Sequence, residues 1–522
     1  MSVRFINDIK NSVCKVLGVN RLYNFDIPYS LNEQYESGGT GFFVDPVEFG
    51  SKFTAKRNSR YLLTNFHVVQ NFVSKQCILE FPQRNKSYLM AEVMFVAPNL
   101  DVAVLELDIS LPQVKWWSGD HIQWLEGIKN CPLNTKDIVK GASQQITAIG
   151  FPNLCQDYQI SNGSLSSRGL GMLSCDLSIN SGNSGGPLFH KNKVIGICTA
   201  TICDSERLSL AVPIQEIFRF FNYFCCFKKQ ILRLPCWGFT LKNVTDDYLD
   251  FKGVDRAFKG VLLKDIIEKS PADKCGLKKG DILMGIETID KSGKTIKYNI
   301  DTFGQITFAS TDKRVRIDCV EYMLNLDPST LFMHYYRKKK IYRKAITMEA
   351  IDFKVRTRFP AYEDLQYTIF GGLVFTDFHL NMLEGDEEEE EEVDNIFDHG
   401  VLNTLKTSYG MSSMVILTHI PPQSYTSFST DLQENDQIVK VNNKKVKGIH
   451  HLISMLDRIV KEYYSTTSTK SNFITLSTTS DEHVLSIPQL SEAEREMSSA
   501  LKDTVLLRLL KKKKEKKRKR RS

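Results

Sequence analysis

Short runs of β-branched and aromatic residues, separated by glycine, proline, asparagine and serine, fill roughly the first 230 residues of the chain. Apolar residues with helical spacing stand only near the end of this region, at 213–224. Many short strands between turn residues are typical of an all-β barrel or sandwich. The pattern predicts strands that include residues 41–44, 61–64, 102–107, 146–149 and 194–197.

The pattern changes after this β-rich region. An apolar run at 260–263 leads into a helix start at Ser270-Pro271, and a Gly-containing stretch with a further apolar run follows at 276–283. A similar unit recurs about 155 residues later, at 432–442, and precedes an apolar-periodic helix over 449–460. We interpret these segments as two diverged copies of one module.

The formal net charge of +7 is unevenly distributed along the chain. Residues 511–521 hold ten basic groups and one Glu, so this tail alone carries +9 and the rest of the chain sums to −2. The nine acidic residues within 384–394 are too charged to pack into a core and predict a solvated loop. A Ser/Thr-rich stretch at 465–480 predicts a second loop. The body of the protein is therefore not basic.

The basic tail has three interpretations: a nuclear or nucleolar import signal, a nonspecific nucleic-acid contact, or a solubilising end. We favour import, because the N-terminus lacks the apolar segment of a secretory signal and no other address is evident. The sequence thus predicts a nuclear or nucleolar protein, with the cytoplasm as the alternative. The acidic block could also pair with the tail at low salt.

Membrane, metal and nucleotide chemistry are not indicated. The longest apolar run, 217–227, contains Arg219 and falls well short of the roughly 20 residues that cross a bilayer. Twelve cysteines without a C-x-x-C pair favour buried free thiols over disulfides or zinc. No G-x-x-x-x-G-K-[ST] motif is present, so ATP need not enter. We expect no cofactor, no metal and no membrane partner.

The segment Gly-Asn-Ser-Gly-Gly-Pro at 182–187 carries the sharpest chemical signal. Glycines on both sides of Ser184 allow a tight turn that exposes the hydroxyl and aims consecutive backbone N–H groups at one point. An oxyanion hole requires such an arrangement. Ser184 is the candidate nucleophile, although an ordinary Gly-rich turn between strands would show the same pattern.

A serine nucleophile needs a base, and the β-rich region offers His67, His121 and His190. His67 follows the predicted strand 61–64, where a side chain at a strand end can face a cleft. His121 lies in a polar loop, and His190 is expected to point away from Ser184 or to lie at the surface. We select His67 as the base.

The acid that orients the base should stand at the edge of a buried strand, where an unpaired charge would be costly. Asp101 immediately precedes the apolar run 102–107 and fits this description. An acid at a strand start is also a common turn residue. Asp108 and Asp120 are rivals by position, but neither has a comparable context.

Together, His67, Asp101 and Ser184 with their flanking residues resemble the Deg/HtrA (DegP-like) serine proteases of the chymotrypsin-fold clan. The resemblance covers nearly the whole chain and points to the branch of plants and protists that carries two PDZ-type modules. Three departures leave the triad untouched but put the loops that switch this family between inactive and active states in doubt: Ser181 in place of the usual Pro, a loose match of 161–166 to the usual Thr-x-Gly-x-Val-Ser loop, and a small insertion at 47–60. The matching landmarks are Gly39-Thr40-Gly41-Phe42 and residues 63–69, 100–105, 150–152, 176–188, 210–213, 303–308 and 370–375.

The resemblance implies a mainly β fold, with a chymotrypsin-like double β-barrel protease domain followed by two PDZ-like α+β modules. Residues 11–16 resemble the opening strand of the protease, which leaves no room for a removable transit peptide. The implied domains are a trypsin-like serine protease domain at 1–232, a first PDZ domain at 233–345, a second, divergent PDZ-like domain with the acidic loop at 346–500, and a disordered basic tail at 501–522.

The resemblance further implies an ATP-independent serine endopeptidase that degrades damaged or unfolded proteins through an acyl-enzyme. His67, Asp101 and Ser184 form its triad, and the backbone N–H groups of Gly182, Asn183 and Ser184 its oxyanion hole. Assembly as a trimer or a multiple of trimers is implied as well.

In this clan the floor of the specificity pocket lies about six residues before the nucleophile. Here that position is Ser178, flanked by Leu177 and Ile179. No acid is present to hold a Lys or Arg side chain. We therefore predict cleavage after small or medium apolar residues such as Val, Ala, Ile or Thr.

For the modules, the PDZ resemblance implies a groove that binds peptide C-termini as an added strand, with Trp237-Gly238-Phe239 as the carboxylate loop of the first module. A purely structural role in packing and assembly is an equal alternative. Two other classes of protein stay open: a latent-protease PDZ scaffold or chaperone, and a nuclear nucleic-acid-associated protein in which the tail dominates.

Overall fold

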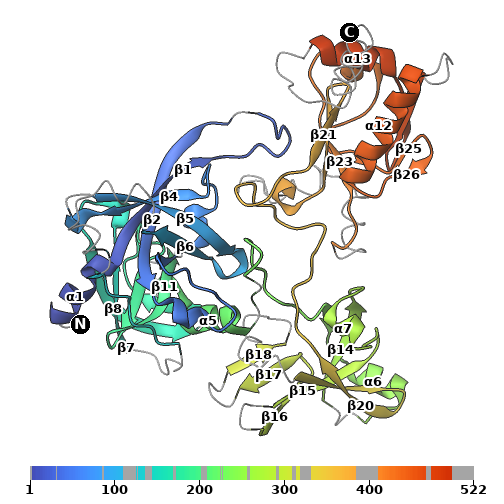
Figure 1. The fold of residues 1–522 in the computed structure, drawn as a ribbon. Helices are drawn as coiled ribbons and strands as arrows, with labels where there is room; N and C mark the ends of the chain where they lie inside the picture. Colours follow the sequence, from blue (N-terminus) through green and yellow to red (C-terminus); the bar gives the residue numbers. More distant parts are fainter. Residues whose placement is uncertain are drawn as a thin grey trace. The chain divides into compact units, whose positions relative to one another are not determined.

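In the computed structural model the chain divides into two compact units, residues 1–21 with 34–351 and residues 22–33 with 352–522. Each unit is described by itself (Figure 1). The structure describes residues 3–30, 32–84, 87–109, 125, 127–135, 144–168, 172–201, 208–223, 225, 227–255, 259–289, 293–308, 313–317, 331–383, 410–465 and 472–496. The predicted acidic loop and basic tail lie outside these residues.

Six antiparallel strands form a first closed barrel in the order β1-β2-β3-β6-β5-β4. The helix α1 (Val3–Ile9) precedes it, and α2 (Phe66–Val69) follows β3. The apolar run 102–107 lies in β6 and is buried along its whole length, as predicted. The strands are β1 (Val13–Arg21), β2 (Gln34–Val44), β3 (Ser59–Thr64), β4 (Gln76–Phe81), β5 (Ser87–Ala97) and β6 (Val102–Asp108).

A second closed barrel follows in the order β10-β11-β12-β9-β8-β7, and α5 (Ile214–Tyr223) ends this region. One buried apolar cluster includes Phe42 of the first barrel, Ile197 of the second and Phe218 of α5, so the barrels share a core. The predicted double β-barrel is confirmed. Its second set of strands is β7 (Gln144–Gly150), β8 (Gln159–Arg168), β9 (Leu173–Asp176), β10 (Pro187–His190), β11 (Lys193–Thr201) and β12 (Leu208–Pro213).

The first module is built on a sheet in the order β13-β14-β15-β19-β20, with β16 paired to β15 and a separate hairpin β17–β18. Its core contains Trp237, Leu263 and Tyr335. Ser270 caps the helix α7 by accepting a hydrogen bond from the Asp273 N–H, as its sequence context predicts. The elements are β13 (Phe239–Lys242), α6 (Asp246–Lys252), β14 (Val261–Ile266), α7 (Pro271–Lys274), β15 (Ile282–Ile289), β16 (Thr295–Asn299), β17 (Gln305–Phe308), β18 (Lys313–Arg316), β19 (Leu331–Arg337) and β20 (Lys340–Ile346).

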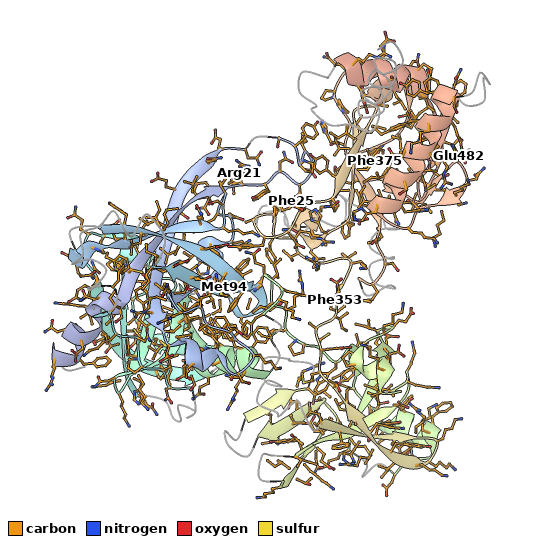
Figure 2. The ribbon with its side chains drawn as sticks, viewed as in Figure 1. Arg21, Phe25, Met94, Phe353, Phe375 and Glu482 are labelled. Atoms are coloured by element: carbon orange, nitrogen blue, oxygen red, sulfur yellow. The ribbon has the colours of Figure 1, made fainter. Side chains whose placement is uncertain are left out.

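The second module has two four-stranded sheets, β21-β22-β23-β24 and β26-β25-β27-β28. The helix α12 begins at Ile449, as predicted, and buries Leu452, Leu456 and Val460 against the module core. In Figure 2, Phe375 belongs to β22 and is buried, whereas Glu482 begins β28. The elements are β21 (Tyr367–Phe370), β22 (Leu373–Asp377), β23 (Val415–His419), α11 (Tyr425–Ser429), β24 (Gln437–Ile438), β25 (Lys440–Val441), β26 (Lys444–Lys445), α12 (Ile449–Ser465), β27 (Phe473–Ser477), β28 (Glu482–Ser486) and α13 (Ile487–Glu496).

Residues 22–33, the connection between β1 and β2, pack with the second module. The ring of Phe25, labelled in Figure 2, meets the imidazole of His379 edge-on at 4.9 Å between centroids. Tyr29 packs on the buried pair Ile369 and Val374. The Thr418 hydroxyl donates a hydrogen bond of 2.9 Å to the Asp26 carbonyl. This connection therefore belongs to the unit of the second module.

Burial of His379 predicts that the stability of the second module depends on pH. The side chain is 2% exposed, and this burial, with nearby Arg358, lowers the pKa of His379 from 6.5 to about 4. Because its pKa is higher in the unfolded chain, the unfolded chain binds the extra proton first, and stability falls as the pH drops from about 6.5 towards 4.

We expect β22 and β23 to lose about 2 kcal/mol of local stability between pH 7 and pH 5. Hydrogen exchange of the full chain, corrected for the intrinsic exchange rate at each pH, measures this loss. His379→Gln stays neutral over this range and should remove most of the pH dependence. An unchanged pH dependence in that variant would contradict the assignment to His379.

Among the described residues no helix is long and apolar enough to cross a membrane. The described cysteines are free thiols, and burial raises the pKa of Cys77 and Cys175 to about 12. Such thiols pack as small apolar groups and hold little thiolate at neutral pH. No cluster of three or more His, Cys, Asp or Glu side chains that could hold a metal is found in the described part of the chain.

Candidate active site

His67 lies on the short helix α2, one turn after the end of β3. The sequence placed it at a strand end, and the strand does end at Thr64, but a helical turn carries the side chain. The neighbours Phe66, Val68 and Val69 are buried and anchor this turn, whereas the His67 side chain is 43% exposed. Burial of its neighbours therefore holds an accessible imidazole in place.

Asp101 lies opposite His67, between the 3₁₀ turn Pro98–Leu100 and β6. Its backbone is left-handed, with φ of 49°, a conformation that Asp and Asn tolerate better than most residues. One carboxylate oxygen, Oδ1, accepts a hydrogen bond of 3.0 Å from the His67 backbone N–H, and the other, Oδ2, lies 2.9 Å from His67 Nδ1. The carboxylate thus holds both the backbone and the ring of His67.

Ser184 stands in a tight turn between two glycines with positive φ, Gly182 at 92° and Gly185 at 88°. A Cβ on Gly185 would lie 2.0 Å from the Thr40 carbonyl oxygen, so only glycine fits there. The Asn183 N–H donates to the Asn180 carbonyl at 3.0 Å. Within the described part of the chain, the N–H groups of Gly182 and Ser184 donate to no protein acceptor. Two of the three predicted oxyanion-hole donors are therefore available, and Asn183 already has a partner.

Thr199 on β11 joins the two halves of the site, and sequence reasoning did not identify it. Its hydroxyl donates a short hydrogen bond to Asp101 Oδ2, and its carbonyl accepts a 3.0 Å hydrogen bond from Ser184 Oγ. Among the described residues, no hydrogen bond joins Ser184 to His67. A threonine within an apolar strand was the only signal in the sequence, and many structural threonines share it.

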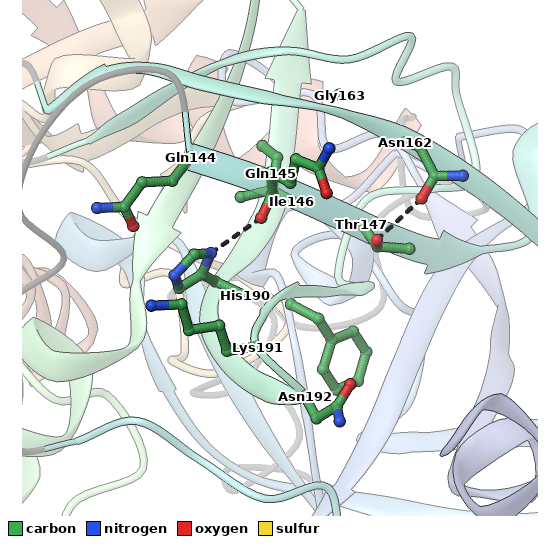
Figure 3. A pocket seen from close by; sticks show the side chains of 10 residues that line it. Gln144, Gln145, Ile146, Thr147, Asn162, Gly163, His190, Lys191 and Asn192 are labelled. Carbon is green, nitrogen blue, oxygen red and sulfur yellow. Dashed lines mark hydrogen bonds between the residues drawn. The ribbon is translucent and has the colours of Figure 1, made fainter. Parts of the chain in front are cut away.

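The rival candidates lie elsewhere or outside the described residues. His190 accompanies Gln144, Thr147 and Asn162 along a surface pocket of about 800 Å³, and its Nδ1 lies 2.9 Å from the Gln145 carbonyl oxygen (Figure 3). None of His67, Asp101 and Ser184 lines this pocket. Asp108 stands at the far end of β6 from Asp101. His121 and Asp120 fall outside the described residues.

The three residues predicted to form the specificity pocket do not face the same way. The side chains of Leu177 and Ile179 are buried in the core of the second barrel. Ser178 between them is exposed, because successive side chains of an extended segment alternate in direction. Only Ser178 of the three is therefore accessible to a substrate side chain.

The predicted carboxylate loop of the first module precedes β13, the outer strand of the described sheet. Trp237 is 2% exposed, and its indole N–H donates to the Ile317 carbonyl at 2.8 Å. Gly238 has a positive φ of 79° and lies against Ser270. The Trp237 and Phe239 rings stack in the core and Gly238 is buried as well, so neither the side chains nor the backbone of these three residues presents much surface to a peptide.

Comparison with known proteins agrees with this architecture. Residues 39–197 match the model of the trypsin-like peptidase domain, and residues 360–499 match that of the PDZ domain. The putative protease Do-like 3, mitochondrial, of Arabidopsis thaliana is 25% identical over 89% of this chain and 75% of its own length.

Bacterial and structural relatives match over smaller shares. A probable periplasmic serine endoprotease, DegP-like, of Pseudomonas putida is 29% identical over 48% of this chain and 47% of its own length. The chain thus spans about half the length of this relative. A solved HtrA-type protease, AlgW with decapeptide, is 17% identical over 66% of this chain and 98% of its own, with a TM-score of 0.44.

The comparisons overturn one expectation from the sequence. The Arabidopsis relative carries a mitochondrial name and the Pseudomonas relative a periplasmic one, which contradicts the predicted nuclear or nucleolar location. A basic tail is a weak indicator of cellular location, because the same run of charged residues also increases solubility.

The fold and the other comparisons agree with the family that the sequence resembles. Two closed six-stranded barrels match the predicted protease fold, a PDZ domain follows them, and the Arabidopsis and Pseudomonas relatives are named as a putative protease and a probable serine endoprotease. The chain belongs to the Deg/HtrA family of serine-type endopeptidases.

Proposed function

We propose that this protein is an ATP-independent endopeptidase for damaged or unfolded proteins, with Ser184 as nucleophile, His67 as general base and Asp101 as the acid that orients the base. The observation that carries this proposal is the pairing of His67 Nδ1 with Asp101 Oδ2 at 2.9 Å, which leaves the other ring nitrogen, Nε2, to accept a proton.

Each group in the proposed mechanism has a defined task. His67 Nε2 removes the Ser184 proton as Oγ attacks the scissile carbonyl, and Asp101 stabilises the imidazolium that forms. The Gly182 and Ser184 N–H groups hold the oxyanion of the tetrahedral intermediate. His67 then returns the proton to the leaving amine, and water repeats the sequence to release the acyl group from Ser184.

The Ser184 hydroxyl must turn before it can react. It donates to the Thr199 carbonyl at 3.0 Å, so attack requires a rotation about its Cα–Cβ bond towards His67 Nε2. Catalytic hydrogen bonds often tighten only when substrate is bound. Such a rotation is compatible with an enzyme that becomes active on binding its substrate.

For specificity, we propose cleavage after small or medium apolar residues such as Val, Ala, Ile or Thr. Ser178 is the exposed residue at the predicted pocket position, and neither Leu177 nor Ile179 brings a charge to it. A pocket without a carboxylate gives no counter-charge to Lys or Arg. Unfolded proteins expose the apolar residues that folded proteins bury.

Incubation with an unfolded, casein-like protein tests activity and specificity together. We expect the wild type to yield fragments, and Ser184→Ala to yield none. Mass spectrometry of the fragment ends should place most cleavages after Val, Ala, Ile or Thr. Fragments that end mainly in Lys or Arg would contradict the specificity proposal but leave the protease proposal intact.

A latent-protease PDZ scaffold or chaperone that binds peptide C-termini is the second candidate. The Ser184 hydroxyl directed at Thr199 rather than His67 favours it, as does β13, the outer strand of the sheet among the described residues, whose edge could pair with a peptide. A wild type that binds peptide C-termini but yields no casein fragments, with or without such peptides added, would favour this candidate. Assembly into trimers or multiples of trimers stays a prediction.

A further inference from the structure

We infer that Thr40 is a positioning residue that holds the nucleophile turn, residues 180–186, between the two barrels. Thr40 lies on β2 of the first barrel and is 0% exposed. Each of its polar groups has a hydrogen-bond partner, and most of these partners lie in the nucleophile turn or beside it. The inference rests on the proposed role of Ser184.

The backbone of Thr40 fixes the nucleophile itself. Its N–H donates to the Ser184 carbonyl at 2.8 Å, and its own carbonyl accepts a 2.8 Å hydrogen bond from the Thr64 hydroxyl. Thr64 ends β3, three residues before His67. The Thr40 backbone therefore ties the turn that carries Ser184 to the strand that leads to His67.

The Thr40 hydroxyl fixes the nucleophile turn at a second point. It donates to the Gly182 carbonyl at 2.7 Å and accepts from the Phe151 N–H at 3.1 Å. Gly182 lies two residues before Ser184 in the nucleophile turn, and Phe151 immediately follows β7 of the second barrel. One side chain thus joins the turn to both barrels.

These contacts bracket the two proposed oxyanion donors. The Thr40 hydroxyl holds the carbonyl of Gly182, and the Thr40 N–H holds the carbonyl of Ser184, so Thr40 restrains both residues whose N–H groups have no acceptor among the described residues. An isosteric side chain without the hydroxyl would leave the Gly182 carbonyl and the Phe151 N–H without this partner in a buried place. The turn would shift to recover partners, and small displacements of reacting groups reduce turnover strongly.

The test compares Thr40→Val, Thr40→Ser and a matched control, Thr147→Val, in the full chain. Thr147 on β7 is 5% exposed, and its hydroxyl donates to Asn162 Oδ1 at 2.9 Å, away from Ser184. Both valine variants lose one buried, hydrogen-bonded hydroxyl. Only Thr40→Val removes a contact to the nucleophile turn.

We expect Thr40→Val to lower kcat by about 10- to 100-fold, with KM within about twofold of the wild type. Thr40→Ser keeps the hydroxyl and should retain kcat within about threefold, and Thr147→Val should do the same. Thr40→Val with the kcat of Thr147→Val would overturn the inference. Failure of Thr40→Ser to restore kcat would also overturn it, because the hydroxyl would then not be the group that matters.

Hydrogen exchange provides a readout that does not depend on proteolysis. Thr40→Val should speed exchange of the Phe151 N–H and of the Gly185 and Gly186 N–H groups, whose acceptors are the Cys198 and Asn183 carbonyls. Thr147→Val should leave these amides unchanged. If the wild type cleaves nothing, the proposed function fails, while the exchange data still decide whether Thr40 holds the turn. Equal exchange in both valine variants would refute the inference.

Discussion

Alanine in place of His67 is expected to lower kcat by about 10⁴- to 10⁶-fold, close to the loss expected for Ser184→Ala. Removing the imidazole removes the acceptor for the Ser184 proton, and no other described histidine lies at this site. The side chain is 43% exposed, so its removal should cost little stability. Release of fragments from an unfolded protein substrate, followed over enzyme concentrations that span several decades, measures the loss.

His190→Ala is the matched control for His67→Ala. His190 belongs to the same pair of barrels, and its ring lies 2.9 Å from the Gln145 carbonyl oxygen on a separate surface pocket. We expect its kcat to stay within about threefold of the wild type. The double variant His67→Ala with Ser184→Ala should be no slower than either single variant, because the two groups act as a unit. A His67→Ala enzyme that keeps a tenth of its turnover would rule out the triad.

Asp101→Asn is expected to lower kcat by about 10⁴-fold while the protein stays folded. Asparagine tolerates the left-handed backbone at this position, with φ of 49°, as well as aspartate does. The carboxylate accepts from the His67 N–H through Oδ1 and from the Thr199 hydroxyl through Oδ2. An amide has only one acceptor oxygen, so its NH₂ group must face a donor or His67 Nδ1, which disturbs the tautomer that places the free lone pair on Nε2.

Thermal unfolding and kcat should be measured together for Asp101→Asn, with Asp108→Asn as the control at the opposite end of β6. We expect both variants to melt within a few degrees of the wild type and only Asp101→Asn to lose turnover. A loss below about tenfold would show that another group orients His67. Parallel losses of kcat and of melting temperature in both variants would assign Asp101 a structural role instead.

Local patterns predicted several elements well, because a buried strand or helix needs apolar residues at adjacent or regularly spaced positions in the sequence. The apolar run 102–107 became β6, which is buried along its length, and the periodic segment 449–460 became α12, which begins at Ile449. The helix continues to Ser465, beyond the predicted end, with Lys461 and Glu462 exposed and Tyr463 and Tyr464 half-buried against the module core, so the apolar period did not mark its end. The modules were similar enough to predict a repeat, yet the first forms the hairpin β17–β18 after β16 where the second forms α12.

The proposed triad could be inferred from short motifs because each member carries its own local signal: glycines around Ser184, a strand end before His67, and a buried strand after Asp101. Thr199 and Thr40 carry no such signal. A buried threonine in a strand satisfies its hydroxyl in many ways, and its partner depends on how the barrels close. Thr199 meets Asp101 from 98 residues away, and Thr40 meets Gly182 from 142 residues away.

The amino-acid sequence was thus sufficient for the family and for the two barrels, and it singled out the three residues on which the chemistry is proposed to rest. Motifs and apolar runs consist of residues that are close together in the sequence, so the burial that they favour can be predicted without the tertiary structure. Three features could be seen only in the tertiary structure. The Ser184 hydroxyl points to Thr199, the Asn183 N–H already donates a hydrogen bond within its turn, and Leu177 and Ile179 are buried beside an exposed Ser178. The first two depend on which polar group finds which partner once distant strands meet, and the third on which side chains of one segment pack into the second barrel; both are decided only in the closed fold.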